Sequence, residues 1–268
     1  MLGLVLACGA AKVAVPPSSP CVATQTSVDC PYATTALSAG GLSRNVYSKV
    51  PAGDAPDGGW PAVLGFQGSY VGAVNIWHGQ AGDPFGALYQ TQVVSALLEA
   101  GYAVLTPEVK GAGTTFWDTN VPPYAGDWES SSDHKLMLAI FAAMKAGTFG
   151  PIDSTRLYAT GISSGGYMTS RMAVSYPGRF RALAIAAGSY ATCGGALCSI
   201  PLPLPSDHPP TLFLHGEKDA IVPIATMTRY RDALEAIGIQ TKTVTDPDKG
   251  HEWVPQSPAA VRDFFNAH

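Results

Sequence analysis

Residues 158–167 read Tyr-Ala-Thr-Gly-Ile-Ser-Ser-Gly-Gly-Tyr, an apolar strand that passes through the pattern Gly-x-Ser-x-Gly into a helical stretch. A serine at such a strand-to-helix turn is held in a strained backbone conformation, which exposes its hydroxyl at the edge of a sheet. Gly161 and Gly165 are expected because the strand and the helix pass too close there for a Cβ atom. Ser163 is therefore the candidate nucleophile.

Strands and helices alternate along the chain on both sides of this turn. The alternation predicts a mostly parallel central sheet with helices on both faces, and the serine turn narrows this α/β class to the α/β-hydrolase fold. Residues 189–209 are too few for a folded lid, so we expect no large lid domain and an open catalytic end. The expected strands are 42–50, 60–66, 102–105, 156–160, 181–187, 211–214 and 241–245, and the expected helices are 90–100, 133–147, 166–176, 224–238 and 258–267.

Length and composition limit the number of domains and the kinds of partner and cofactor. The chain has 268 residues, enough for one sizeable core, and we assign 41–268 to a single α/β-hydrolase domain. The net charge is −4 and no basic run occurs, so no nucleic-acid partner is expected. No apolar stretch is long enough for a transmembrane helix. No metal-ligand cluster or dinucleotide-binding glycine pattern is present, so neither a metal nor an organic cofactor is expected.

The N-terminus carries signs of export. Residues 1–11 form a short apolar run that resembles the end of an export signal, although a basic start is missing. Val5-Leu-Ala-Cys8 also resembles a lipoprotein cleavage box, which would make Cys8 a lipid-attachment site, and a late start codon would look the same. Residues 12–40 are predicted to be an extended leader that is pinned by a disulfide between Cys21 and Cys30. We expect a secreted protein, with an outer-membrane lipoprotein as the alternative.

The other four cysteines form two close pairs in the sequence. Neither pair has the companions of a zinc site, so disulfides Cys21–Cys30 and Cys193–Cys198 are the simplest interpretation, with reduced buried thiols as the alternative. Disulfides would imply an oxidising compartment.

The segment Gly65-Phe-Gln-Gly-Ser-Tyr70 ends an early strand and begins a glycine turn. In serine hydrolases of the α/β type, the loop after this strand supplies one backbone N–H of the oxyanion hole, and the residue after the nucleophile supplies the other. The predicted donors are the N–H groups of Ser69 and Ser164, with Gly68 or Tyr70 as alternatives for the first.

A serine nucleophile requires a base, and the base requires an acid that holds its tautomer. In this fold class the chain order is serine, then acid, then histidine, and the acid and histidine follow late strands whose ends share one edge of the sheet. Asp219 fits the acid position and His251 fits the base position. The predicted catalytic set is Ser163, Asp219 and His251.

Several residues compete for these two positions. Glu217 is the main alternative acid, and Asp246 and Asp248 would have to fold back onto the histidine that follows them. His215 is a weaker candidate base, because a histidine beside glycine at a strand end more often braces the loop. The remaining histidines precede the serine, lie in the 189–209 segment or end the chain; they are His78, His134, His208 and His268.

The loop 107–132 carries Trp117, Tyr124 and Trp128 among Gly, Pro and Asp residues. Long loops in compact domains are usually functional or disordered, and three large aromatic residues argue against disorder. These side chains either line a substrate surface or pack the loop onto the domain. We include Trp117 and Trp128 in a predicted substrate surface, together with Tyr70 and Trp253.

These motifs together resemble a known family. Gly161-Ile-Ser-Ser-Gly165 followed by Gly-Tyr-Met, Asp219 within His-Gly-Glu-Lys-Asp-Ala-Ile-Val-Pro, and Gly250-His251-Glu-Trp253 are similar to the secreted depolymerases of medium-chain-length polyhydroxyalkanoates. The resemblance runs from about residue 20 to the C-terminus. It implies a serine esterase that hydrolyses water-insoluble polyesters such as poly(3-hydroxyoctanoate) outside the cell, with Ser163, Asp219 and His251 as its triad.

Other substrates fit the same residues. The low content of charged residues, 13% against about 25% in a typical soluble domain, and an open site suit adsorption to an apolar solid. They would equally suit a short-chain polyhydroxybutyrate depolymerase or a feruloyl or acetyl esterase. An acyltransferase and a non-catalytic binding protein are more distant alternatives.

Overall fold

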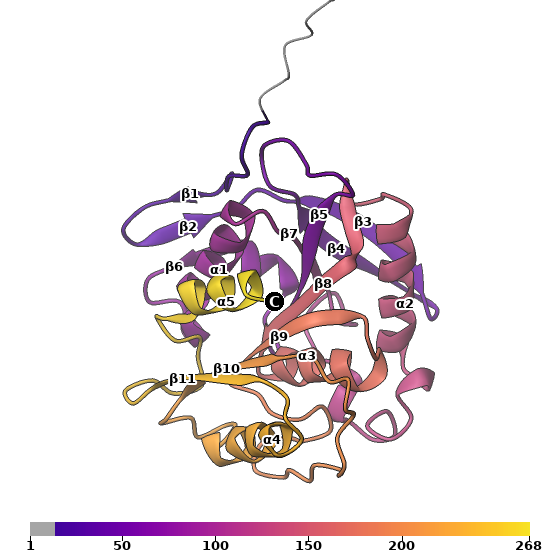
Figure 1. The fold of residues 1–268 in the computed structure, drawn as a ribbon, viewed down its shortest axis with the longest axis vertical. Coiled ribbons are helices and arrows are strands. Elements are labelled where there is room, and N and C mark those ends of the chain that lie inside the picture. Colours follow the sequence, from indigo (N-terminus) through magenta and orange to yellow (C-terminus); the bar gives the residue numbers. More distant parts are fainter. Residues whose placement is uncertain (1–13) are drawn as a thin grey trace, which may run out of the picture.

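A computed structural model describes residues 14–268, and the expected export signal with Cys8 lies outside this range. The main sheet has eight strands in the order β11-β10-β9-β8-β5-β7-β4-β3, and Figure 1 shows it running through the middle of the molecule. Its members are β3 (Ala33–Ala39), β4 (Leu42–Lys49), β5 (Trp60–Phe66), β7 (Ala103–Pro107), β8 (Ile152–Ile162), β9 (Phe180–Ala186), β10 (Thr211–Gly216) and β11 (Thr241–Asp246). The six strands from β7 to β11 in this order pair in parallel, and β3 and β4 pair antiparallel at one edge.

Five helices cover the two faces of this sheet (Figure 1). Neighbouring strand residues alternate between the faces, so Val63 packs into one hydrophobic cluster and Leu64 into another. The first face carries α1 (Ala87–Glu99) and α5 (Ser257–Asn266). The second carries α2 (Ser132–Lys145), α3 (Ser164–Ser175) and α4 (Ile224–Ala236). The predicted α/β-hydrolase architecture without a large lid is confirmed, and the helices and strands expected after residue 41 are present with small shifts of their ends.

The N-terminal segment differs from the expected leader. β3 forms a hairpin with β4 through Gly40 and Gly41, so a boundary at residue 40 falls within the main sheet. Further back, β1 (Val22–Ala23) and β2 (Ser27–Asp29) pair with each other, and β2 pairs with β6 (His78–Gln80). Most of the β3 side chains are small and at least partly exposed, so backbone pairing stabilises this strand without an apolar pattern in the sequence.

Both expected disulfides are present. Cys21–Cys30 closes the β1–β2 hairpin, and Cys193–Cys198 closes a short loop between β9 and β10. Of the helices between residues 14 and 268, none combines the length and the apolar character that crossing a membrane requires.

Candidate active site

Ser163 occupies a strained turn between β8 and α3. Its backbone has φ 58° and ψ −120°, a combination that non-glycine residues rarely adopt. A Cβ on Gly161 would collide with the carbonyl oxygen of Gly165, and a Cβ on Gly165 would collide with that of Phe66. The expected reason for both glycines is confirmed. The Ser163 N–H donates to the carbonyl of Ala186 at 3.1 Å, which ties the turn to the end of β9.

Asp219 and His251 lie in the turns that follow β10 and β11, and they are hydrogen-bonded. The His251 Nδ1–H donates to Asp219 Oδ2 at 2.8 Å. The other carboxylate oxygen accepts the N–H groups of Ile221 and Val222 at 2.9 and 2.8 Å. In neutral imidazole this leaves Nε2 of His251 as the proton acceptor.

The surroundings of Asp219 keep it ionised. Burial acts to raise the pKa of this carboxyl group, but hydrogen bonds from His215, His251 and the Val222 N–H outweigh burial and lower the pKa well below its ordinary value. A permanent negative charge beside Nδ1 fixes the tautomer of His251 and would stabilise its imidazolium form.

The competing acids form other bonds. Glu217 accepts the hydroxyl of Thr245 at 2.8 Å, Asp246 accepts the N–H of Asp248 at 3.0 Å, and Asp248 pairs with Lys218 at 2.8 Å. His215 is fully buried and its Nε2–H donates to the carbonyl of Val222 at 2.8 Å, so it braces the Asp219 turn as the sequence suggested.

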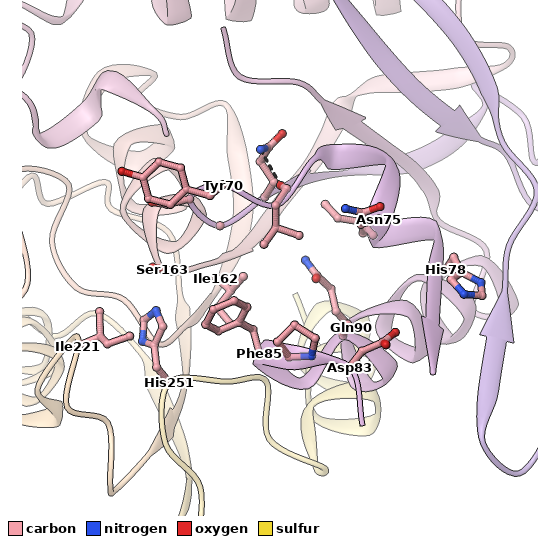
Figure 2. A pocket seen from close by; sticks show the side chains of 17 residues that line it. Tyr70, Asn75, His78, Asp83, Phe85, Gln90, Ile162, Ser163, Ile221 and His251 are labelled. Carbon is pink, nitrogen blue, oxygen red and sulfur yellow. Dashed lines mark hydrogen bonds between the residues drawn. The ribbon is translucent and has the colours of Figure 1, made fainter. Parts of the chain in front are cut away.

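Ser163 and His251 line the same cavity, which has a volume of about 480 Å³. This size is in the range of small-molecule sites. Figure 2 shows Ser163, Ile162 and His251 at one side of the cavity and Asn75, His78 and Asp83 at the other. The site can therefore hold an acyl group beside the serine hydroxyl.

Of the backbone N–H groups predicted for the oxyanion hole, those of Gly68, Ser69 and Ser164 remain candidates. Gly68 lies against the nucleophile, because a Cβ on Gly68 would be 3.8 Å from Cβ of Ser163. The Tyr70 N–H donates to the carbonyl of Thr115 at 2.9 Å, which removes it from the alternatives. Ser69 lines the cavity, and the Ser164 N–H is in the first turn of α3, where no helical carbonyl can accept it.

Gln67 is a residue of this site that the sequence analysis missed. It is fully buried, and its Nε2 donates to the carbonyls of Val71 and Gly113 at 2.7 and 2.9 Å while Oε1 accepts the N–H of Val109 at 3.4 Å. The side chain therefore holds the 68–70 turn against the loop after β7. The available signal was its position between a buried strand and a glycine turn.

Three of the four residues assigned to a substrate surface are in the core. Trp117, Trp128 and Trp253 are 0%, 5% and 1% exposed, so this assignment is wrong for them. The indole N–H of Trp117 donates to the carbonyl of Gln67 at 3.1 Å, and that of Trp128 donates to the Tyr176 hydroxyl at 3.2 Å. They pack the 107–132 loop onto the domain, which is the alternative that the sequence left open.

The fourth residue, Tyr70, lines the cavity and is 73% exposed. Two further exposed apolar residues that the sequence analysis missed, Phe85 and Ile221, also line it. Among residues 14–268, five non-glycine residues have positive φ, and Tyr70, Phe85 and Ser163 are three of them. Backbone strain in this molecule is thus concentrated at one cavity, as is common for functional sites.

The turn that carries Phe85 is fastened to the histidine loop. The Trp253 N–H donates to the carbonyl of Phe85 at 3.0 Å, and a Cβ on Gly86 would collide with the carbonyl oxygen of Trp253. The Phe85 ring meets that of His251 edge to face, with 6.2 Å between the ring centroids. The buried Trp253 therefore joins the η2 turn to the loop that carries His251.

A poly(3-hydroxyoctanoate) depolymerase of Pseudomonas fluorescens is 49% identical to this chain over 242 residues, which cover 90% of the chain and 86% of the relative. The phospholipase/carboxylesterase family profile matches residues 129–268. This chain belongs to the poly(3-hydroxyoctanoate) depolymerase family of α/β-hydrolases. It is an ester hydrolase.

Solved structures agree with the fold of this depolymerase family member. An S-formylglutathione hydrolase of Staphylococcus aureus is 14% identical, with a TM-score of 0.59 over 94% of the chain and 98% of the hydrolase. A truncated carbohydrate esterase from gut microbiota is 16% identical, with a TM-score of 0.60 over 83% of the chain and 90% of the esterase. At these identities the likeness concerns the fold alone.

Proposed function

We propose that this protein hydrolyses the ester bonds of medium-chain-length poly(3-hydroxyalkanoates), with Ser163, His251 and Asp219 as its catalytic triad. The observation that carries the proposal is the 49% identity to a poly(3-hydroxyoctanoate) depolymerase over nearly the whole chain. The hydrogen bond between His251 and Asp219, and the cavity that Ser163 shares with His251, support the assignment of the triad.

The proposed reaction has two halves. His251 takes the proton of Ser163 as the hydroxyl oxygen attacks the ester carbonyl, and the Ser69 and Ser164 N–H groups stabilise the oxyanion. The C–O bond to the leaving chain then breaks, and His251 gives the proton to the departing alkoxide. Water attacks the acyl-enzyme by the same route and releases a carboxylic acid, with Asp219 holding the His251 tautomer throughout.

Clearing of a turbid poly(3-hydroxyoctanoate) suspension tests this proposal. The native protein should clear it, and Ser163→Ala should lower kcat by about 10⁶, since the nucleophile of such a triad is required in both halves. A fluorophosphonate should label the native protein at Ser163. Clearing that survives the substitution would reject Ser163 as the nucleophile. Hydrolysis of polyhydroxybutyrate, feruloyl or acetyl esters in preference to the octanoate polymer would reject the substrate.

We further propose that the protein is secreted. The two disulfides support an oxidising compartment, because such bonds are rare in reducing cytosol. Fractionation of a producing culture should place the protein in the medium, and mass spectrometry of its mature N-terminus would distinguish simple cleavage from lipidation at Cys8.

A further inference from the structure

The cavity and a polymer differ in shape. A polyester backbone continues beyond both ends of the ester that is cleaved, so it has to lie across an open mouth. The alkyl branch of each repeat unit ends after a few carbons, and it is the part that can enter a cavity of about 480 Å³. Ile76, Ile162 and Phe85 give the interior apolar surface, which suits an alkyl branch.

A second, much smaller void lies behind this cavity. Its volume is about 10 Å³, close to the least that holds one water molecule. Its walls are mostly apolar and come from the inner face of α1, from β7 and from Trp253. Such a space is closed to substrate in the present packing.

Two side chains line both spaces, Ile76 and Gln90. Ile76 belongs to the short helix η1 (Ala73–Trp77) and is 3% exposed, so its side chain is enclosed between the cavity and the void. Gln90 reaches into the cavity from α1, between Ile162 and Asn75 in the view of Figure 2. Together they form a partition at the inner end of the cavity.

We propose that Ile76 determines the length of the alkyl branch that the enzyme accepts, because it closes the inner end of the cavity against the void behind it. The inference rests on the proposed function and specifies its substrate preference. Ile76→Ala removes the side chain beyond Cβ and joins the two spaces, so the cavity lengthens along apolar walls. A longer branch then gains buried contacts that the native enzyme cannot offer.

The experiment measures kcat/KM for p-nitrophenyl esters from butanoyl to dodecanoyl. The measured quantity is the ratio of the dodecanoyl to the octanoyl kcat/KM. In Ile76→Ala this ratio should rise about tenfold, which is the lower end of the discrimination that an apolar pocket achieves for an added methylene. Ile76→Val should move the ratio in the same direction by less. The matched control is Ile140→Ala on α2, because Ile140 is fully buried in the cluster on the opposite face of the sheet.

Each outcome decides a separate point. A raised ratio in the two Ile76 variants and a native ratio in Ile140→Ala support the inference. Folded, active Ile76 variants with the native ratio overturn it, while leaving the esterase assignment intact. A native protein that hydrolyses none of these esters overturns the proposed function itself. Thermal melting establishes which variants are folded, and if Ile76→Ala unfolds, Ile76→Val decides the question.

Discussion

The two sides of the cavity are built in different ways. On the catalytic side, Ser163, Asp219 and His251 each follow a strand of the main sheet within a short turn. The opposite wall consists of η1, β6 and the single turn η2 (Pro84–Gly86), which lie between β5 and α1. Behind that wall, β6 pairs with β2 of the disulfide-closed hairpin.

This difference assigns the chemical step to one side of the cavity and the acyl preference to the other. The reacting groups follow strands of the parallel sheet. The strands β8 and β10, which precede Ser163 and Asp219, are paired on both sides, and β11, which precedes His251, pairs with β10 at the edge of the sheet. The wall consists of shorter elements. Ile76 and Trp77 of η1 pack into the core, the Trp77 indole N–H donates to the Thr106 hydroxyl at 2.6 Å, and the hairpin behind β6 is closed by one disulfide. Substitutions on the catalytic side should therefore change the rate, and substitutions behind the wall should change stability and acyl preference.

After Ser163→Ala, the largest effect is expected for Asp219→Asn. Asparagine has one acceptor oxygen, and its NH2 group can only donate, so it cannot accept both from the Ile221 and Val222 N–H groups and from His251 Nδ1–H. With the NH2 group facing Nδ1, the required histidine tautomer is no longer favoured. We expect kcat on a soluble octanoyl ester to fall by about 10⁴. Glu217→Gln is the matched control, since Glu217 accepts from Thr245, and it should retain native kcat. The opposite pattern would transfer the acid role to Glu217.

Gln67→Leu tests the support of the oxyanion turn. Leucine keeps the volume of Gln67 but removes its bonds to Val71, Gly113 and Val109. We expect kcat to fall about 10²-fold with little change in KM, since loss of one oxyanion donor costs about 10² to 10³. Ser131→Ala provides the control, because Ser131 is buried and its hydroxyl accepts the His134 N–H at the start of α2. A loss of stability with unchanged kcat in Gln67→Leu would contradict this role.

The same contrast explains what the sequence could reveal. Ser163, Asp219 and His251 were predictable because strand ends in a parallel sheet share one edge and the fold class fixes the chain order. The wall was not, because η1 and η2 are single turns without a periodic apolar pattern. Ile76 and Phe85 therefore carried no signal that distinguishes them from other loop residues.

The tryptophans were misplaced for another reason. A loop rich in Gly, Pro and Asp is expected at the surface, since its polar groups need partners. Here the partners are buried within the protein: Arg171 donates to Thr119, and Asp133 accepts from Arg44 and from the Asp118 N–H at 2.8 Å. These bonds join residues far apart in the chain, so local sequence could not show that the loop is internal.

A smaller effect, on the free energy of unfolding, is expected for His208, which lies behind the catalytic side. His208 is buried, its Nδ1–H donates to the carbonyl of Pro209, and Nε2 accepts the Tyr230 hydroxyl at 2.6 Å. Burial lowers the pKa of His208 to about 4. The unfolded chain, with an ordinary pKa of about 6.5, binds the proton first, so the free energy of unfolding should fall by about 3 kcal/mol between pH 7 and pH 4.

Urea unfolding at several pH values measures this contribution of His208. In His208→Gln the part of the slope between pH 6.5 and pH 4 that this residue supplies should disappear, because glutamine does not titrate. A variant with the full native slope would show that other groups cause the loss in acid.

The smallest effect is expected behind the wall, for the double substitution Cys21→Ser and Cys30→Ser. The bond spans a sequence separation of 9, and the loop-entropy account gives a loss of about 2.5 kcal/mol in the free energy of unfolding. β2 pairs with β6, and β6 continues directly from η1. Loosening this hairpin should therefore also bring the kcat/KM values for the octanoyl and dodecanoyl esters closer together. The parallel sheet is untouched, so kcat on the octanoyl ester should stay near its native value.

The control is the double substitution Cys193→Ser and Cys198→Ser. It should lower the free energy of unfolding slightly less, since the sequence separation of this disulfide is 5. It should keep the native acyl preference, because the N–H of Gly195 in its loop donates to the Tyr167 hydroxyl of α3 and not to the wall. Equal changes of preference in the two double variants would show that the wall depends on the whole domain, and would remove the separation between its two sides.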